Sequence, residues 1–148
     1  MNITIYTDGG CTGNPGPGGW GAVLLVNGQE IELSGGAPQT TNNQMELTAV
    51  TKALEYIAKE YSIKDDTLSI YTDSQYVKNG ITSWIINWER NGWKTASKKP
   101  VKNKDFWIEL RTLTKIANIE WFWVKGHSGD KYNELCDLLV AKERVKFA

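Results

Sequence analysis

The sequence predicts an α/β fold in which a mixed five-stranded sheet is flanked by helices. Five segments are rich in β-branched and aromatic residues, and other segments carry apolar residues at helical spacing. The first three β-segments follow one another with only short connections, whereas a helical segment precedes each of the last two. Short turns favour antiparallel pairing and helical connections favour parallel pairing. Strands 1–3 are therefore expected to be antiparallel, and the later strands parallel.

The first three strands are predicted over residues 3–8, 20–26 and 29–34. The first of them, Ile-Thr-Ile-Tyr-Thr-Asp, alternates in character and is rich in β-branched residues. Asn27-Gly28 separates the second strand from the third and is a strong hairpin signal. Residues 34–43 are rich in glycine, threonine and asparagine, so we expect a loop there.

Residues 16–21 spell G-x-G-x-x-G, which raises the alternative of a dinucleotide-dependent enzyme. That fingerprint requires a helix directly after the glycines, whereas a predicted β-hairpin follows here. Pro15 and Pro17 further disfavour entry into a helix, and no G-K-[ST] completes a P-loop. The glycines are therefore expected to form a tight turn between two antiparallel strands.

The first helix is predicted from Asn42 or Asn43 to Tyr61, with Asn43 and Glu46 placed as in a capping box. Its apolar positions recur at helical spacing: Val50, Ala53, Leu54 and Ile57. The remaining helices are expected over residues 74–79, 81–90, 105–117 and 131–145. Strands are expected over residues 67–73 and 119–125, a polar basic loop over 91–104 and a turn at "GHSGD". No domain linker interrupts this series, so residues 1–148 are expected to form a single domain.

The chain has 148 residues and a formal net charge of zero, but its charges are unevenly distributed. Residues 78–104 contain seven basic residues and one acid, so this segment is strongly positive and the remainder is equally negative. Cys11 and Cys136 are expected to be free thiols, and no Cys/His cluster suggests zinc. The sequence shows no signal peptide and no apolar run of membrane length. A cytoplasmic protein without membrane association is therefore expected.

Two β-segments end alike, "ITIYTD" at Asp8 and "LSIYTD" at Asp73. If these strands are parallel neighbours, the two aspartates lie side by side at the edge of the sheet where ligands gather. The alternative is that each aspartate only ends a strand and begins a turn. Because both strands end in the same way, the ligand-binding interpretation of Asp8 and Asp73 is favoured.

Two further acids are candidates for the same site. Glu46 lies on the helical stripe that should face the sheet, where a carboxylate needs a partner. The helix dipole explains an acid near a helix start, but not its inward direction. Asp137 lies near the start of the last helix, where an aspartate alone is commonplace.

Clustered carboxylates raise one another's pKa values and require cations, and oxygen ligands suit Mg²⁺ or Mn²⁺. Two such ions about 4 Å apart support phosphodiester cleavage.

Five stretches together resemble ribonuclease H of the type I family in its short bacterial form: "YTDGGCTGNPGPGGWGAVL", "TTNNQMELTAV", "YTDSQYVKNGITSWIINW", "NGWKTASKKPVKN" and "WVKGHSGDKYNELCD". The resemblance implies a ribonuclease H-like fold and endonucleolytic hydrolysis of the RNA strand of an RNA–DNA hybrid. Products with 5′-phosphate and 3′-hydroxyl ends are implied, as are two Mg²⁺ ions per active site, with Mn²⁺ as an alternative. The family's metal ligands match Asp8, Glu46, Asp73 and Asp137, and His127 matches an auxiliary histidine for proton transfer or product release.

The resemblance also implies substrate contacts. Groove-contacting amides match Asn14, Asn42, Asn43 and Gln75, although local turn and capping roles also suit the asparagines. Thr41 and Asn103 match a pocket for a phosphate of the DNA strand. The basic protrusion of the family, which holds that strand, matches a segment that includes Trp93, Lys94, Lys98 and Lys99.

Two departures from the family pattern predict modest hybrid affinity. Gln39 stands where many relatives have arginine, and Glu89 interrupts the basic segment.

The protein is expected to be a monomer. The rival functions are a non-catalytic binding module, which would lack an acid, and another nuclease of this fold, which would lack the "GHSGD" turn and the basic protrusion.

Overall fold

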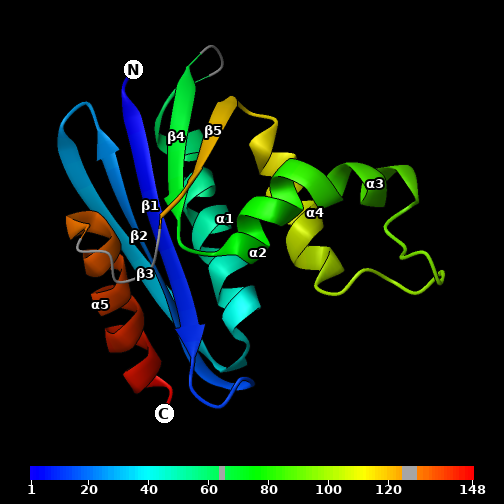
Figure 1. Ribbon diagram of the computed structural model, residues 1–148. Coiled ribbons are helices and arrows are strands. Elements are labelled where there is room, and N and C mark those ends of the chain that lie inside the picture. The colour runs from blue at the N-terminus through cyan, green and yellow to red at the C-terminus, as the bar shows by residue number, and fades with distance from the viewer. Residues whose placement is uncertain (64–65, 125–129) are drawn as a thin grey trace.

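A five-stranded sheet with the order β3-β2-β1-β4-β5 forms the centre of the molecule (Figure 1). The computed structural model describes residues 1–63, 66–124 and 130–148. The strands are β1 (Ile3–Cys11), β2 (Gly16–Val26), β3 (Gln29–Thr40), β4 (Thr67–Thr72) and β5 (Asn118–Trp123). The β1–β2 and β2–β3 pairs are antiparallel, whereas the β1–β4 and β4–β5 pairs are parallel. This pattern confirms the predicted mixed sheet.

Helices cover both faces of the sheet. They are α1 (Asn42–Glu60), α2 (Gln75–Asn79), the π-helical turn η1 (Gly80–Trp84), α3 (Ile85–Arg90), α4 (Lys104–Thr114) and α5 (Lys131–Lys146). Leu24 of β2 points into the core that α1 completes, whereas its near neighbour Gly21 lies against Leu139 of α5. Because alternate residues of a strand face opposite sides, α1 and α5 lie on opposite faces. No helix of the described ranges is long and apolar enough to cross a membrane.

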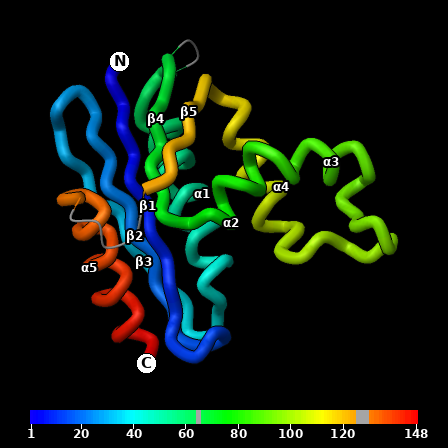
Figure 2. Tube along the Cα trace, in the orientation of Figure 1, coloured from blue at the N-terminus to red at the C-terminus, as the bar shows by residue number. Residues whose placement is uncertain are grey.

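The segment from α2 to α4 extends away from the sheet, as Figure 2 shows. It carries the basic loop and is joined to the core by Trp107, which is fully buried in α4. Gly80 is required at this junction, because a Cβ there would lie 2.0 Å from the ring of Trp107. The two predicted helices of this region are thus one continuous helical path, with a π-helical turn at Gly80–Trp84 where Trp107 packs.

The glycine-rich segments are strands where loops were expected. β3 continues to Thr40, so the predicted loop at residues 34–43 is wrong for most of its length. A Cβ on Gly36 would lie 2.3 Å from the carbonyl oxygen of Gly18, and one on Gly19 would lie 2.6 Å from that of Val140 in α5. Glycine here permits close approach of the neighbouring strand and of α5. The formal G-x-G-x-x-G precedes no helix, as predicted, but it lies within β2, so the tight turn expected at these glycines is wrong.

The N-cap of α1 is Thr41, and the predicted cap at Asn42 or Asn43 is wrong by one or two residues. The Thr41 hydroxyl oxygen accepts a hydrogen bond from the Gln44 N–H at 3.2 Å. Thr41 and Gln44 therefore have the spacing of a capping box, threonine at the cap and glutamine three residues later. The side chains of Asn42 and Asn43 therefore do not cap α1, and the amide oxygen of Asn42 accepts from the Cys11 N–H instead.

Candidate active site

Three carboxylates meet where β1 and β4 end. The parallel register pairs Thr7 with Thr72, which brings Asp8 and Asp73, the next residues, side by side. Glu46 joins them from α1, and one carboxylate oxygen from each of the three lies within 4.8 Å of the others. The structure thus unites three of the four acids predicted from the sequence.

Gly9 determines how closely α1 approaches this edge of the sheet. A Cβ at this position would lie 2.4 Å from the backbone carbon of Met45 and 2.5 Å from the backbone nitrogen of Glu46. Any side chain would therefore push α1, and with it Glu46, away from Asp8. The sequence contains this glycine beside the aspartate, but only the packing of α1 shows why it is needed.

Two of the three carboxylates are buried, and Asp73 is half-buried. Asp8 is 6% exposed and Glu46 8%. Burial, followed by the negative charge of Asp73, raises the pKa of Asp8 to about 7, and Asp137 adds to the effect. Burial and the charges of Asp8 and Asp73 raise the pKa of Glu46 well above its ordinary value. The buried Oε2 of Glu46 has no hydrogen-bond partner among the described residues. A divalent cation bound by these oxygens would offset the repulsion between the carboxylates. It would also give Oε2 of Glu46 a partner.

Asp137 lies on α5 outside this tight group. Residue Asp137 is exposed, and its charge raises the pKa of Asp8 less than the charge of Asp73 does. The helix that carries it begins at the N-cap Asp130, which accepts hydrogen bonds from two backbone N–H groups at 3.0 Å. Asp137 is thus at the rim of the site. His127 falls outside the described residues.

A second set of predicted residues lines a cavity of about 300 Å³. It is lined by Asn14, Pro15, Thr41, Asn42, Asn43, Lys102 and Asn103. The structure therefore gathers five of the predicted substrate contacts around one space and adds Lys102. In the sequence, the only signal for Lys102 was that it lies in the basic segment of residues 78–104.

The polar side chains of this cavity present hydrogen-bond donors. The Asn42 N–H donates to Oδ1 of Asn14 at 2.9 Å, and the Cys11 N–H donates to Oδ1 of Asn42 at 2.8 Å. The hydroxyl oxygen of Thr41 accepts from the Gln44 N–H. Because backbone N–H groups only donate, these bonds occupy the acceptor oxygens and leave the amide and hydroxyl hydrogens for a ligand. Together with Lys102, the cavity is suited to an anion.

The basic loop that follows α3 is held in a defined shape. The Trp93 N–H donates to the Trp88 carbonyl at 2.6 Å, and the Val101 N–H donates to the Trp93 carbonyl at 3.1 Å. Inside the loop, the Thr95 N–H donates to the Lys99 carbonyl at 2.8 Å. These bonds close the loop at its base and across its middle.

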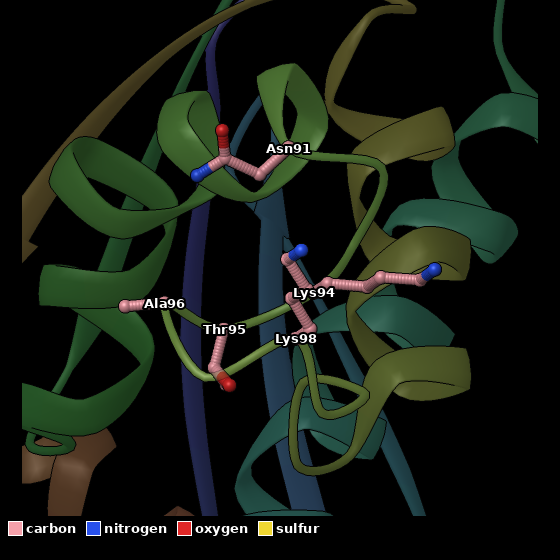
Figure 3. Close-up of a pocket in the computed structure, with 5 residues that line it drawn as sticks. All are labelled: Asn91, Lys94, Thr95, Ala96 and Lys98. Atoms are coloured by element: carbon pink, nitrogen blue, oxygen red, sulfur yellow. The ribbon is translucent and has the colours of Figure 1, made fainter.

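Lysines surround an open hollow of about 540 Å³ in this loop, which is lined by Asn91, Lys94, Thr95, Ala96 and Lys98 (Figure 3). Lys99 is also exposed. The predicted contact Trp93 is half-buried, with its ring 6.3 Å from that of Trp88, whereas Trp84 is 38% exposed. Gln75 is exposed at the start of α2, two residues beyond Asp73.

Glu89, the acid that interrupts the basic segment, faces α4. One carboxylate oxygen pairs with Arg111 Nε at 3.0 Å and the other with Lys115 Nζ at 3.6 Å. Its charge is therefore balanced within the fold and ties α3 to α4. The structure gives Glu89 a structural role that its place in the sequence did not indicate.

Comparisons with known proteins agree with this geometry. The family model described as RNase H matches residues 1–145. A ribonuclease H of Ehrlichia ruminantium is 55% identical over 97% of this chain and 95% of its own length. The structure of LC9-RNase H1, a type 1 RNase H with the type 2 active-site motif, has a TM-score of 0.85 at 29% identity over 99% of this chain and 73% of that chain. LC11-RNase H1 in complex with an RNA/DNA hybrid has a TM-score of 0.71 at 26% identity over 98% of both chains. The chain therefore belongs to the ribonuclease H family.

Proposed function

We propose that this enzyme is an endonuclease that cleaves the RNA strand of RNA–DNA hybrids with two divalent metal ions, leaving 5′-phosphate and 3′-hydroxyl ends. The observation that carries the proposal is the trio of Asp8, Glu46 and Asp73, in which one carboxylate oxygen from each residue lies within 4.8 Å of the others. The binding of a hybrid by LC11-RNase H1, a similar structure, supports the substrate.

The donor set suits hard cations. Asp8, Glu46, Asp73 and Asp137 would hold Mg²⁺, or Mn²⁺ in its place, through carboxylate oxygens alone. When bound, such a pair of ions activates water and stabilises the leaving 3′-oxygen of an in-line displacement. Asp8, which lies beside both Glu46 and Asp73, would be a ligand of both ions. Glu46, whose Oε2 has no hydrogen-bond partner in the described part of the chain, would ligate metal close to the 2′-hydroxyl that distinguishes RNA from DNA. His127 would assist proton transfer or product release.

The cavity beside α1 would hold a phosphate of the DNA strand. Its donors come from Asn14, Thr41, Asn42 and Asn103, and Lys102 supplies a positive charge close by. Asn43 and Gln75 would complete the contacts to the minor groove. Gln39 is exposed near the end of β3, and it supplies no charge to this pocket where arginine would, which predicts modest affinity.

The basic loop would neutralise further phosphates of the DNA strand. Lys94, Lys98 and Lys99 would act as point charges there, and the resulting affinity would fall as salt rises. Trp93 would contact the same strand from the base of the loop. Since Glu89 is already paired with Arg111, it takes little from this charge.

The proposed enzyme acts as a monomer in the cytoplasm. One chain supplies all four carboxylates and both candidate anion sites, so no second copy is needed to complete them. Both cysteines are free thiols, as is usual in a reducing compartment.

The ends of the products test the two-metal mechanism. RNA fragments released from a hybrid in Mg²⁺ are expected to be ligatable at their 5′ ends without prior phosphorylation, because water attacks phosphorus and the 3′-oxygen leaves. Fragments from alkaline hydrolysis of the same RNA, which carry 5′-hydroxyl ends, serve as the control. Products with 5′-hydroxyl and 2′,3′-cyclic phosphate ends would show instead that the 2′-hydroxyl attacks, and the mechanism would be wrong.

A further inference from the structure

A chain of side-chain hydrogen bonds leads from the anion cavity into the core. Oδ1 of Asn103 accepts from Nε2 of Gln44 at 3.2 Å, and Nδ2 of Asn103 donates to the Tyr76 hydroxyl oxygen at 3.2 Å. The same oxygen accepts from the indole N–H of Trp107 at 3.0 Å. At the other end, the Thr40 hydroxyl donates to Oε1 of Gln44 at 3.1 Å. Residues from β3, α1, α2 and α4 are thereby linked through Asn103.

The side chain of Asn103 is oriented by hydrogen bonds to residues of other helices. Its backbone is left-handed, with φ 60° and ψ 30°, and it precedes α4 as the N-cap without a capping hydrogen bond from its side chain. The Asn103 amide is instead held at both ends, by Gln44 on one side and by Tyr76 on the other. A single Nδ2 hydrogen remains for a ligand in the cavity, because one of the two is committed to Tyr76.

The two supporting residues do not line the cavity themselves. Tyr76 is fixed in turn, because its ring lies 5.2 Å from the ring of Trp107 and 5.8 Å from that of Trp84. Gln44 is fixed by its place in the first turn of α1, where its backbone N–H caps on Thr41. Tyr76 and Gln44 are therefore held in place themselves, and they in turn hold the side chain of Asn103.

We propose that Tyr76 and Gln44 are positioning residues that hold the Asn103 amide in the orientation needed to bind a phosphate of the DNA strand. This inference rests on the proposed function of the cavity. It assigns Tyr76 and Gln44 an effect on hybrid affinity that passes through Asn103 alone, and no effect on the chemical step at Asp8, Glu46 and Asp73.

A double-mutant cycle tests the proposal on the full chain. Tyr76→Phe removes the acceptor and keeps the ring, and Gln44→Met removes the amide and keeps the backbone cap. Each is expected to raise KM for the hybrid about threefold to tenfold, as for one lost hydrogen bond, with kcat changed less than about twofold. In an Asn103→Gly background, where glycine accepts the left-handed backbone, each is expected to add less than about twofold.

Tyr56→Phe is the matched control, since Tyr56 lies on α1 outside this chain of bonds, and its KM is expected to equal that of the wild type. Circular dichroism confirms folding, and Gln44→Met keeps the test decisive if Tyr76→Phe unfolds. An unchanged KM in both variants, or a full penalty that persists beside Asn103→Gly, would overturn the proposal. Failure of the proposed function differs visibly, because the wild-type protein itself would then leave the hybrid uncleaved.

Discussion

Replacement of Asp8 by asparagine is expected to lower the rate of RNA cleavage more than about a hundredfold and to leave the fold intact. Loss of an outer partner of a metal ligand already costs about 10- to 100-fold, and Asp8 is a proposed ligand of both ions. Asparagine keeps the shape of the side chain. Its oxygen is able to accept from the Gly9 N–H, which donates to Asp8 at 2.9 Å, and its amide is able to donate to Glu46.

The measurement is the initial rate of hybrid cleavage in Mg²⁺, with circular dichroism of both proteins. Asp105→Asn is the matched control, because Asp105 is an exposed aspartate on α4 and its replacement is expected to leave the rate unchanged. If Asp8→Asn kept most of the wild-type rate, the assignment of the metal site would be wrong.

The second large effect is a loss of stability in the metal-free protein as pH rises. The folded pKa of Asp8 is about 7, against an ordinary value of 3.8, and that of Glu46 is raised as well. Below about pH 4 both folded and unfolded states are protonated at Asp8, so the group contributes nothing. Between about pH 4 and 7 the unfolded state releases its proton first, and the free energy of unfolding falls. Above pH 7 the penalty is complete.

Urea denaturation in EDTA at pH 4 and pH 8 isolates this effect when the wild type is compared with Asp8→Asn. At pH 8 the variant is expected to be more stable on the order of a few kcal/mol, since one pKa unit corresponds to about 1.4 kcal/mol. At pH 4 the two are expected to be nearly equal. Mg²⁺ at pH 8 is expected to stabilise the wild type, because it binds the native state. An equal difference at both pH values would show that the charge of Asp8, buried and close to Asp73, is not the cause.

The sheet was predictable because its strands repeat a local pattern that tertiary contacts do not override. "ITIYTD" and "LSIYTD" became parallel neighbours, and their shared ending placed Asp8 beside Asp73. The glycine-rich ends of β1, β2 and β3 were not predictable by the same means. Glycine has low intrinsic strand propensity, and its role at Gly36 is visible only once its partner strand is in place.

The site was predictable in its acids and less so in its supports. Carboxylates at strand ends and on a buried helical stripe stand out in a sequence, because burial of a charge requires a reason. Gln44 and Tyr76 carry no such signal. Each is an ordinary residue in a helix, and its importance arises from a long-range hydrogen bond to Asn103, which lies 59 and 27 residues away.

Cleavage of three labelled duplexes of one sequence tests the central claim most directly. An RNA–DNA hybrid, an RNA duplex and a DNA duplex are incubated with the protein in Mg²⁺, and again after addition of EDTA. The proposed function predicts that only the RNA strand of the hybrid is cut, and that EDTA abolishes the cleavage. Equal cleavage of all three duplexes, or cleavage of the hybrid that persists in EDTA, would contradict it.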